Sequence, residues 1–91
     1  MSYEVFYHEL VKKEDLPKLG AKIKDRIRKA IETRLMTSPD VYGKPLRRSL
    51  RGYRKLRVGD YRIIFKISGQ KIKVLIIGHC SWVYEKIMGR I

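Results

Sequence analysis

The sequence predicts a single α+β domain in which helices cover one face of an antiparallel sheet. Apolar runs with period-two alternation follow one another between residues 53 and 79, and a helical pattern of apolar spacings precedes them between residues 21 and 36. A chain of 91 residues supports one hydrophobic core when helices cover a sheet. We therefore expect residues 1–91 to form one domain, with a four-stranded sheet, two N-terminal helices against it and a short C-terminal helix.

The N-terminal third predicts one strand and two helices. Residues 3–7 read YEVFY, an alternation that suits a first strand of the same sheet. The pattern from residue 9 to residue 19 is weakly helical and contains Pro17, so we expect only a short helix there. A clear helix follows Gly20 and extends through Met36, because apolar residues recur at spacings of three and four, namely Ile23, Ile27, Ala30, Ile31 and Leu35.

Two glycine turns divide the second half of the chain into a three-stranded meander. Gly59-Asp60 and Gly69-Gln70 each lie between β-rich runs, after a loop at 37–45 that is rich in Ser, Pro, Asp and Gly. A two-residue first turn pairs Val58 with Tyr61 and hence Arg57 with Arg62. The second turn then predicts that Phe65 lies opposite Val74, Ile63 opposite Ile76 and Arg62 opposite Ile77.

The alternation of the meander predicts one apolar and one basic face. The apolar face forms the core and comprises Leu56, Val58, Ile63, Phe65, Ile67, Ile72, Val74 and Ile76. The other face comprises Lys55, Arg57, Arg62, Ile77 and His79, with His79 as the diagonal neighbour of Arg62. Like charges directly opposite cost up to about 1 kcal/mol, so the two arginines indicate an anion between them. Alternatively, both arginines extend into solvent, where screening weakens their repulsion.

Residues 81–91 predict a short helix that begins beside the basic face. Ser81 is a suitable N-cap, and Val83, Ile87 and Ile91 lie four residues apart. We therefore expect Tyr84 to lie near His79 at the start of this helix.

The net charge of +13 points to phosphate-rich or acidic partners, with nucleic acid as the leading candidate. The sequence has no apolar run long enough to span a bilayer and no lipidation signal, so we expect no membrane association. Its first ten residues lack the pattern of a signal peptide, which favours a cytoplasmic location. The sequence has one cysteine, Cys80, and two histidines, which are too few for a disulfide framework or a structural zinc site.

Basic residues are densest between Lys44 and Arg62, where eight Lys or Arg and one acidic residue occupy nineteen positions. Such a run suits the phosphate backbone of RNA, and it also suits an acidic protein. Fixed cations with one imidazole and one phenol fit RNA cleavage without a metal, in which the ribose 2′-OH attacks the adjacent phosphorus. We expect neither a metal nor a cofactor.

Three strings, GKPLRRSL, YRKLRVGDYRIIF and GHCSWVYEKI, together with the order of elements, carry a resemblance to a known family. The chain resembles toxins of the RelE/ParE superfamily of type II toxin–antitoxin systems, nearer the RelE side. R-x-G-D-Y-R and G-H-x-x-x-V-Y are its most specific parts. The resemblance implies a RelE-like microbial RNase fold and a toxin held inactive by a cognate acidic antitoxin, with operator DNA bound only through the antitoxin complex.

In RelE-like members the activity is cleavage of mRNA on the ribosome, which inhibits translation, and the resemblance implies the same mRNA interferase activity here. By position, Arg62 matches the arginine that stabilises the scissile phosphate, and Lys55 matches a lysine that contacts the phosphate or acts as base. Tyr84 matches a tyrosine that orients or stacks on the substrate base, and His79 stands where related toxins have a histidine. The further residues expected to bind RNA are Arg57, Arg54, Arg51, Arg48, Arg47 and Trp82.

The sequence departs from the family pattern at two places. Cys80, Ser81 and Trp82 stand where many relatives carry a basic pair, and Tyr53 stands at the position of another catalytic lysine. Three interpretations of these changes stay open: lower activity, a different substrate, or replacement of the missing charge by Arg47, Arg48 or Arg51. Trp82 either stacks on a base or packs the last helix onto the sheet.

Two other functions stay open from the sequence. The chain could be a ParE-like inhibitor of a topoisomerase such as gyrase, acting by binding and without nuclease chemistry. It could also be an inactive basic module that binds RNA or an antitoxin. The group of His79, Tyr84 and Lys55 near Arg62 favours the nuclease, because a purely binding toxin needs no proton-transfer group there.

Overall fold

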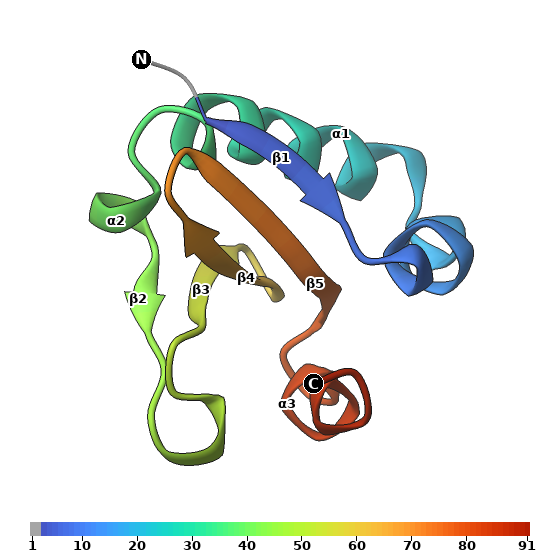
Figure 1. The fold of residues 1–91 in the computed structure, drawn as a ribbon. Helices are drawn as coiled ribbons and strands as arrows, with labels where there is room; N and C mark the ends of the chain where they lie inside the picture. The colour runs from blue at the N-terminus through green and yellow to red at the C-terminus, as the bar shows by residue number, and fades with distance from the viewer. Residues whose placement is uncertain (1–2) are drawn as a thin grey trace.

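Five strands form one sheet in the computed structural model, which describes residues 3–91. They are β1 (Glu4–Tyr7), β2 (Lys44–Pro45), β3 (Arg54–Val58), β4 (Tyr61–Ser68) and β5 (Lys71–His79). Their spatial order is β1-β5-β4-β3-β2, as Figure 1 shows. The predicted α+β class is confirmed, but the sheet has five strands rather than four and is mixed, because β1 runs parallel to β5.

The helical segments follow the predicted order with two corrections. Helix α1 (Ala21–Ala30) continues as a π-helical turn (Ile31–Leu35), which confirms a helix over this stretch. The weak N-terminal pattern forms a π-helical turn (Val11–Asp15) and a 3₁₀ turn (Leu16–Lys18). The expected loop at 37–45 is wrong in part, since it contains helix α2 (Pro39–Tyr42) and strand β2.

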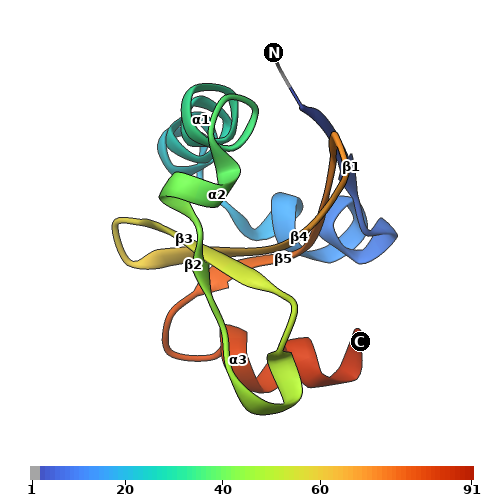
Figure 2. The same cartoon turned by 60° about the vertical axis from the view of Figure 1, so that its left-hand side comes forward.

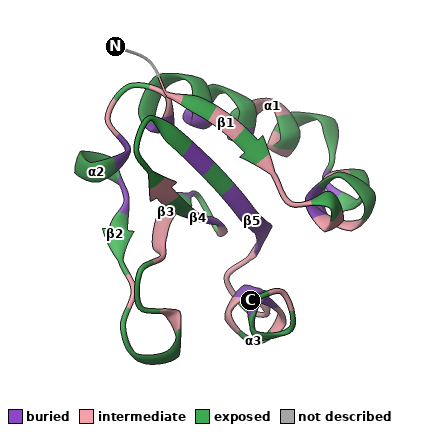
Figure 3. Cartoon of the chain, in the orientation of Figure 1, coloured by how far each residue is buried: buried purple, intermediate pink, exposed green. Residues whose placement is uncertain are grey.

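The sheet separates two hydrophobic cores, and Figure 2 shows α1 on one side of it and α3 (Val83–Lys86) on the other. The larger core lies under α1 and includes Ile27, Ile31, Leu35, Leu56, Ile63, Phe65, Ile72, Val74 and Ile77. The smaller core lies under α3 and comprises Ile64, Leu75, Ile76, Val83 and Ile87. Burial alternates at the start of β5 and is continuous from Val74 to Gly78, because both cores meet on this strand (Figure 3).

A β-bulge decides which residues of β5 face each core. Phe65 pairs with Val74, as predicted, but Ile64 pairs with Ile76, so Leu75 is an extra residue on β5. The expected pairs beyond this point are therefore wrong by one residue: Ile63 lies opposite Ile77, and Arg62 lies opposite Gly78. The extra residue turns Ile77 toward the larger core and Ile76 toward the smaller one.

The C-terminal helix begins one residue later than expected and without a side-chain cap. Its N-cap is Trp82, while the hydroxyl of Ser81 lies 2.9 Å from Nδ1 of His79. Val83 and Ile87 are fully buried, as their spacing predicted. The described helices include none long and apolar enough to cross a membrane.

Candidate nucleic-acid interface

The β3–β4 hairpin holds two arginines side by side. Arg57 lies directly opposite Arg62, which confirms the predicted register. Gly59 has a φ of 61°, a conformation that favours glycine, so the two-residue turn fixes the pairing. Nη1 of Arg62 donates to the carbonyl oxygens of Gly59 (3.0 Å) and Tyr61 (2.9 Å), and Nε of Arg57 points to Gly59 O at 3.4 Å. The hairpin thus presents two adjacent positive charges anchored at one turn.

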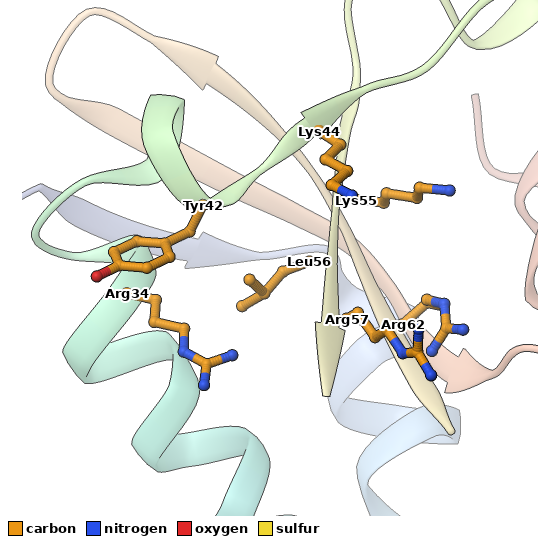
Figure 4. Close-up of a pocket in the computed structure, with 7 residues that line it drawn as sticks. All are labelled: Arg34, Tyr42, Lys44, Lys55, Leu56, Arg57 and Arg62. Carbon is orange, nitrogen blue, oxygen red and sulfur yellow. The ribbon is translucent and has the colours of Figure 1, made fainter. Parts of the chain in front are cut away.

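Both arginines line a cavity of about 250 Å³, which also reaches Arg34 in the helical layer. Its lining is Arg34, Tyr42, Lys44, Lys55, Leu56, Arg57 and Arg62, shown in Figure 4. Five of these seven side chains are cationic and none is acidic, so the cavity attracts anions. Arg34, Tyr42 and Lys44 were not among the predicted site residues, although Lys44 begins the basic run that extends to Arg62. Only the pairing of Lys44 with Lys55 through β2 brings that lysine to the site.

Helix α3 brings Tyr84 to the same face of the sheet. The ammonium group of Lys55 lies 5.8 Å from the centre of the Tyr84 ring, within the range of a cation–π contact. Lys55, Arg57 and Arg62 share this face, because positions 55 and 57 alternate with the buried Leu56 and because Arg62 is the partner of Arg57. The structure therefore brings together three cations and one phenol from β3, β4 and α3.

His79 lies on the opposite face from Arg62, so its predicted diagonal contact with that arginine is wrong. The bulge pairs His79 with Tyr61, and the two rings meet edge to face at 5.6 Å. Nδ1 of His79 accepts the backbone N–H of Ser81 at 3.1 Å. A neutral imidazole that accepts at Nδ1 carries its proton on Nε2, and so presents a donor rather than a base.

Trp82 packs on the α3 side of the sheet, which is also the side of Arg62. Its indole covers Gly78 so closely that a β-carbon at that position would overlap the ring. The ammonium group of Lys86 lies 5.2 Å from the centre of the indole ring. These contacts favour the role of Trp82 as an anchor for α3, one of the two roles that the sequence left open.

The other predicted RNA-binding arginines lie apart from the cavity. Arg54 donates to the carbonyl of Gly43 at 2.9 Å and so ties β3 to the end of α2. Arg47, Arg48 and Arg51 are exposed in the segment between β2 and β3, which includes a 3₁₀ turn (Arg48–Leu50). They form a separate basic surface and do not line the cavity around Arg62.

The cationic side chains at this candidate site suit the binding of a negatively charged group. Among residues 3–91, no three His, Cys, Asp or Glu side chains gather in a group that could hold a metal ion. Adjacent guanidinium groups bind a phosphate through charge-assisted hydrogen bonds, and a neighbouring aromatic ring can contact a base. This arrangement suits a phosphodiester whose charge increases during a reaction.

Residues 3–84 match the family described as the ParE toxin of type II toxin–antitoxin system, parDE. No curated protein matches the sequence.

Solved structures of toxins from such systems share the fold. The toxin–antitoxin complex RelBE2 from Mycobacterium tuberculosis contains a chain with 30% identity and a TM-score of 0.81, over 87% of this chain and 99% of that chain. A mutant of the Escherichia coli toxin RelE in the free state has 20% identity and a TM-score of 0.73, over 99% and 94%. The RelB–RelE antitoxin–toxin complex from Methanococcus jannaschii contains a chain with 23% identity and a TM-score of 0.69. The match covers 89% of this chain and 96% of that chain.

Proposed function

The chain belongs to the ParE toxin family of type II toxin–antitoxin systems, within the RelE/ParE superfamily, and from this premise we propose that it is an endoribonuclease that cleaves mRNA on the ribosome. One observation carries the proposal: Arg57 and Arg62 lie directly opposite each other, with Lys55 and Tyr84 on the same face. A phosphodiester between the two arginines would relieve their repulsion and receive hydrogen bonds from both.

RNA supplies the nucleophile for this reaction. The ribose 2′-OH loses its proton and attacks the adjacent phosphorus, and Arg62 and Arg57 stabilise the negative charge on the five-coordinate phosphorane. The bond to the 5′-oxygen then breaks, and that oxygen takes up a proton. The products are a 2′,3′-cyclic phosphate and a 5′-OH end, so DNA is not a substrate.

Lys55 is the residue that we assign to proton transfer from the 2′-OH. It shares the face of Arg62, whereas His79 lies on the other face with Nδ1 engaged by Ser81. Tyr84, beside Lys55, is the residue that we assign to contact with the substrate base. The catalytic role predicted for His79 becomes a structural one in this proposal, since the imidazole fixes the turn that precedes α3.

A second candidate function is ParE-like inhibition of a topoisomerase by binding alone. The description of the matched family favours it, and so does the position of His79 away from Arg62. The alignment of Lys55, Arg57 and Arg62 on one face favours the nuclease, because a binding surface does not need these groups to converge at one phosphate.

We further propose that the partner protein is an acidic antitoxin. The neighbouring structures from Mycobacterium tuberculosis and Methanococcus jannaschii are toxin–antitoxin complexes. A chain with a net charge of +13 gains speed and specificity of association from complementary negative charge.

Primer extension on mRNA held in translating ribosomes tests the nuclease. The wild-type protein should cleave ribosome-bound mRNA and leave naked RNA intact. Arg62→Ala should cleave roughly 10²- to 10³-fold more slowly, because it removes a donor to the phosphorane. Its binding to ribosomes should remain nearly unchanged, since the other cations supply most of the affinity.

Arg28→Ala is a matched control, because Arg28 is exposed on α1 and pairs with Asp25 and Glu32. It should cleave like the wild type. Folded wild-type protein that cleaves no ribosome-bound mRNA, but blocks supercoiling by gyrase, would replace the nuclease with the second candidate. Loss of binding and cleavage in equal proportion in Arg62→Ala would make Arg62 a docking charge.

A further inference from the structure

A buried ion pair joins Asp15, at the end of the π-helical turn Val11–Asp15, to Arg90 near the C-terminus. Nη1 of Arg90 lies 2.7 Å from Oδ2 of Asp15, and Nη2 lies 2.8 Å from Oδ1, so the contact is bidentate. The side chains are 2% and 0% exposed, respectively. Neither residue belongs to the candidate site described above. Burying two charged groups costs free energy of desolvation unless their partners are well placed.

The Asp15–Arg90 pair forms hydrogen bonds with the backbone of β5 beyond the point where β1 ends. Tyr7, the last residue of β1, pairs with Val74, and the N–H of His8 donates to the Val74 carbonyl. Beyond that point, the Leu75 carbonyl accepts from Nη1 of Arg90 at 2.9 Å, and the Ile77 N–H donates to Oδ2 of Asp15 at 2.9 Å. Two side chains therefore satisfy the backbone groups that a neighbouring strand would otherwise bind.

The same pair holds the C-terminal end of the segment that carries Tyr84. Helix α3 has four residues and continues as a 3₁₀ turn (Ile87–Gly89), which is too short to be stable without tertiary contacts. Trp82 on Gly78 anchors its beginning, and Arg90 on Asp15 anchors its end. Tyr84 lies between these two anchors, with its ring next to Lys55.

We propose that Arg90, held by Asp15, is a positioning residue that fixes Tyr84 beside Lys55. This inference rests on the proposed nuclease for its effect on cleavage, but its structural part does not depend on that activity. The exposed Lys86–Glu14 pair cannot replace it, because their side chains are 34% and 43% exposed and solvent screens the attraction. Arg90 also contacts Glu14 at 3.8 Å, which adds to the negative charge around the guanidinium group.

Arg90→Lys tests the inference with a matched control, Arg28→Lys. Lysine keeps the positive charge, so the protein should fold, but it cannot hold both carboxylate oxygens and the Leu75 carbonyl in the same planar geometry. The cleavage rate at saturating ribosomes should fall about tenfold or more, because small misplacement of a substrate-contacting group is costly. Arg28→Lys should change neither the cleavage rate nor the quenching of Trp82 fluorescence.

Fluorescence of Trp82 provides a readout independent of activity, because it is the only tryptophan. In Arg90→Lys, quenching of this fluorescence by acrylamide should increase about twofold as the segment loosens, while the protein still unfolds in one cooperative step. Asp15→Asn weakens the same contact from the other side and should change quenching and rate in the same direction. If Arg90→Lys does not fold, Asp15→Asn becomes the variant that tests the inference.

A double-mutant cycle separates positioning from general loss of stability. Tyr84→Ala should slow cleavage in the wild type and have little further effect in Arg90→Lys, because that variant has already lost the positioned ring. Fully additive effects would overturn the inference, as would a folded Arg90→Lys with unchanged quenching and rate. If the wild type cleaves nothing, the nuclease proposal fails, and the quenching result still decides whether Arg90 holds the segment.

Discussion

Gly78 is the residue at which the sheet, the C-terminal helix and the basic face meet. It lies opposite Arg62 on β4, and the indole of Trp82 occupies the space that a β-carbon of residue 78 would need. Any larger side chain would occupy the space of that ring. The position of Trp82, and with it the start of α3, therefore depends on the absence of a side chain at residue 78.

Substituting Gly78→Ala should displace Trp82 and destabilise the protein by about 1–3 kcal/mol, the usual cost of overpacking. The free energy of unfolding in urea measures this, with Trp82 fluorescence as the probe. Gly20→Ala is the control, because a β-carbon there meets no atom within 4 Å and should change stability by less than about 1 kcal/mol. Equal stability of the two variants would contradict this account of the Trp82 contact.

At the scale of elements, the β3–β4 hairpin follows directly from the sequence. A glycine with positive φ in a two-residue turn leaves one register for the flanking strands. The pairing of Arg57 with Arg62, and hence the central part of the candidate site, was predictable for this reason.

The bulge on β5 was not predictable, because the run from Val74 to Ile77 is apolar at every position. Alternation can assign faces only where polar and apolar residues alternate, and this strand is buried on both faces in that stretch. Beyond the bulge the register therefore differs by one residue from the predicted one, and His79 lies on the opposite face from Arg62.

Strand β2 and helix α2 were missed for a different reason. Their sequence, rich in Pro, Gly and Asp, is typical of a loop, and their two and four residues depend on tertiary contacts. Arg54 supplies one such contact through its hydrogen bond to Gly43 O. The parallel pairing of β1 with β5 likewise depends on contacts between residues distant in sequence.

Strand β1 provides a test of how burial affects the pH dependence of stability. Burial, and then the charge of Glu32, raise the pKa of Tyr7. The folded protein thus holds the phenol proton more tightly than the unfolded chain, whose tyrosines ionise near pH ~10. Stability from this group is complete below that pH and is lost as pH rises above it.

Tyr7→Phe should therefore lose less stability than the wild type between pH 9 and pH 11. Urea unfolding at intervals across this range measures the difference in slope. Parallel curves for the two proteins would show that Tyr7 does not contribute to the alkaline loss of stability.

At the scale of the whole molecule, one sheet serves two purposes. Figure 2 shows α1 and α3 on opposite sides of this sheet. The α1 side contains the larger core, and the α3 side carries the smaller core beside Lys55, Arg57 and Arg62. The net charge of +13 gives the chain a strong attraction for anionic partners, while the register of one hairpin concentrates part of that charge at a single cavity. Composition therefore accounts for the class of partner that we propose, and topology accounts for the location of the candidate site.

We propose that Arg57 and Arg62 stabilise attack by a 2′-OH on a phosphodiester. The most direct test uses ribosome-bound mRNA with a single 2′-deoxynucleotide on the 5′ side of the cleaved bond, next to an unsubstituted control. The account predicts that the deoxy substitution abolishes cleavage at that bond, and that the control yields a 2′,3′-cyclic phosphate and a 5′-OH. Undiminished cleavage at the deoxynucleotide, with a 5′-phosphate on the downstream product, would contradict it.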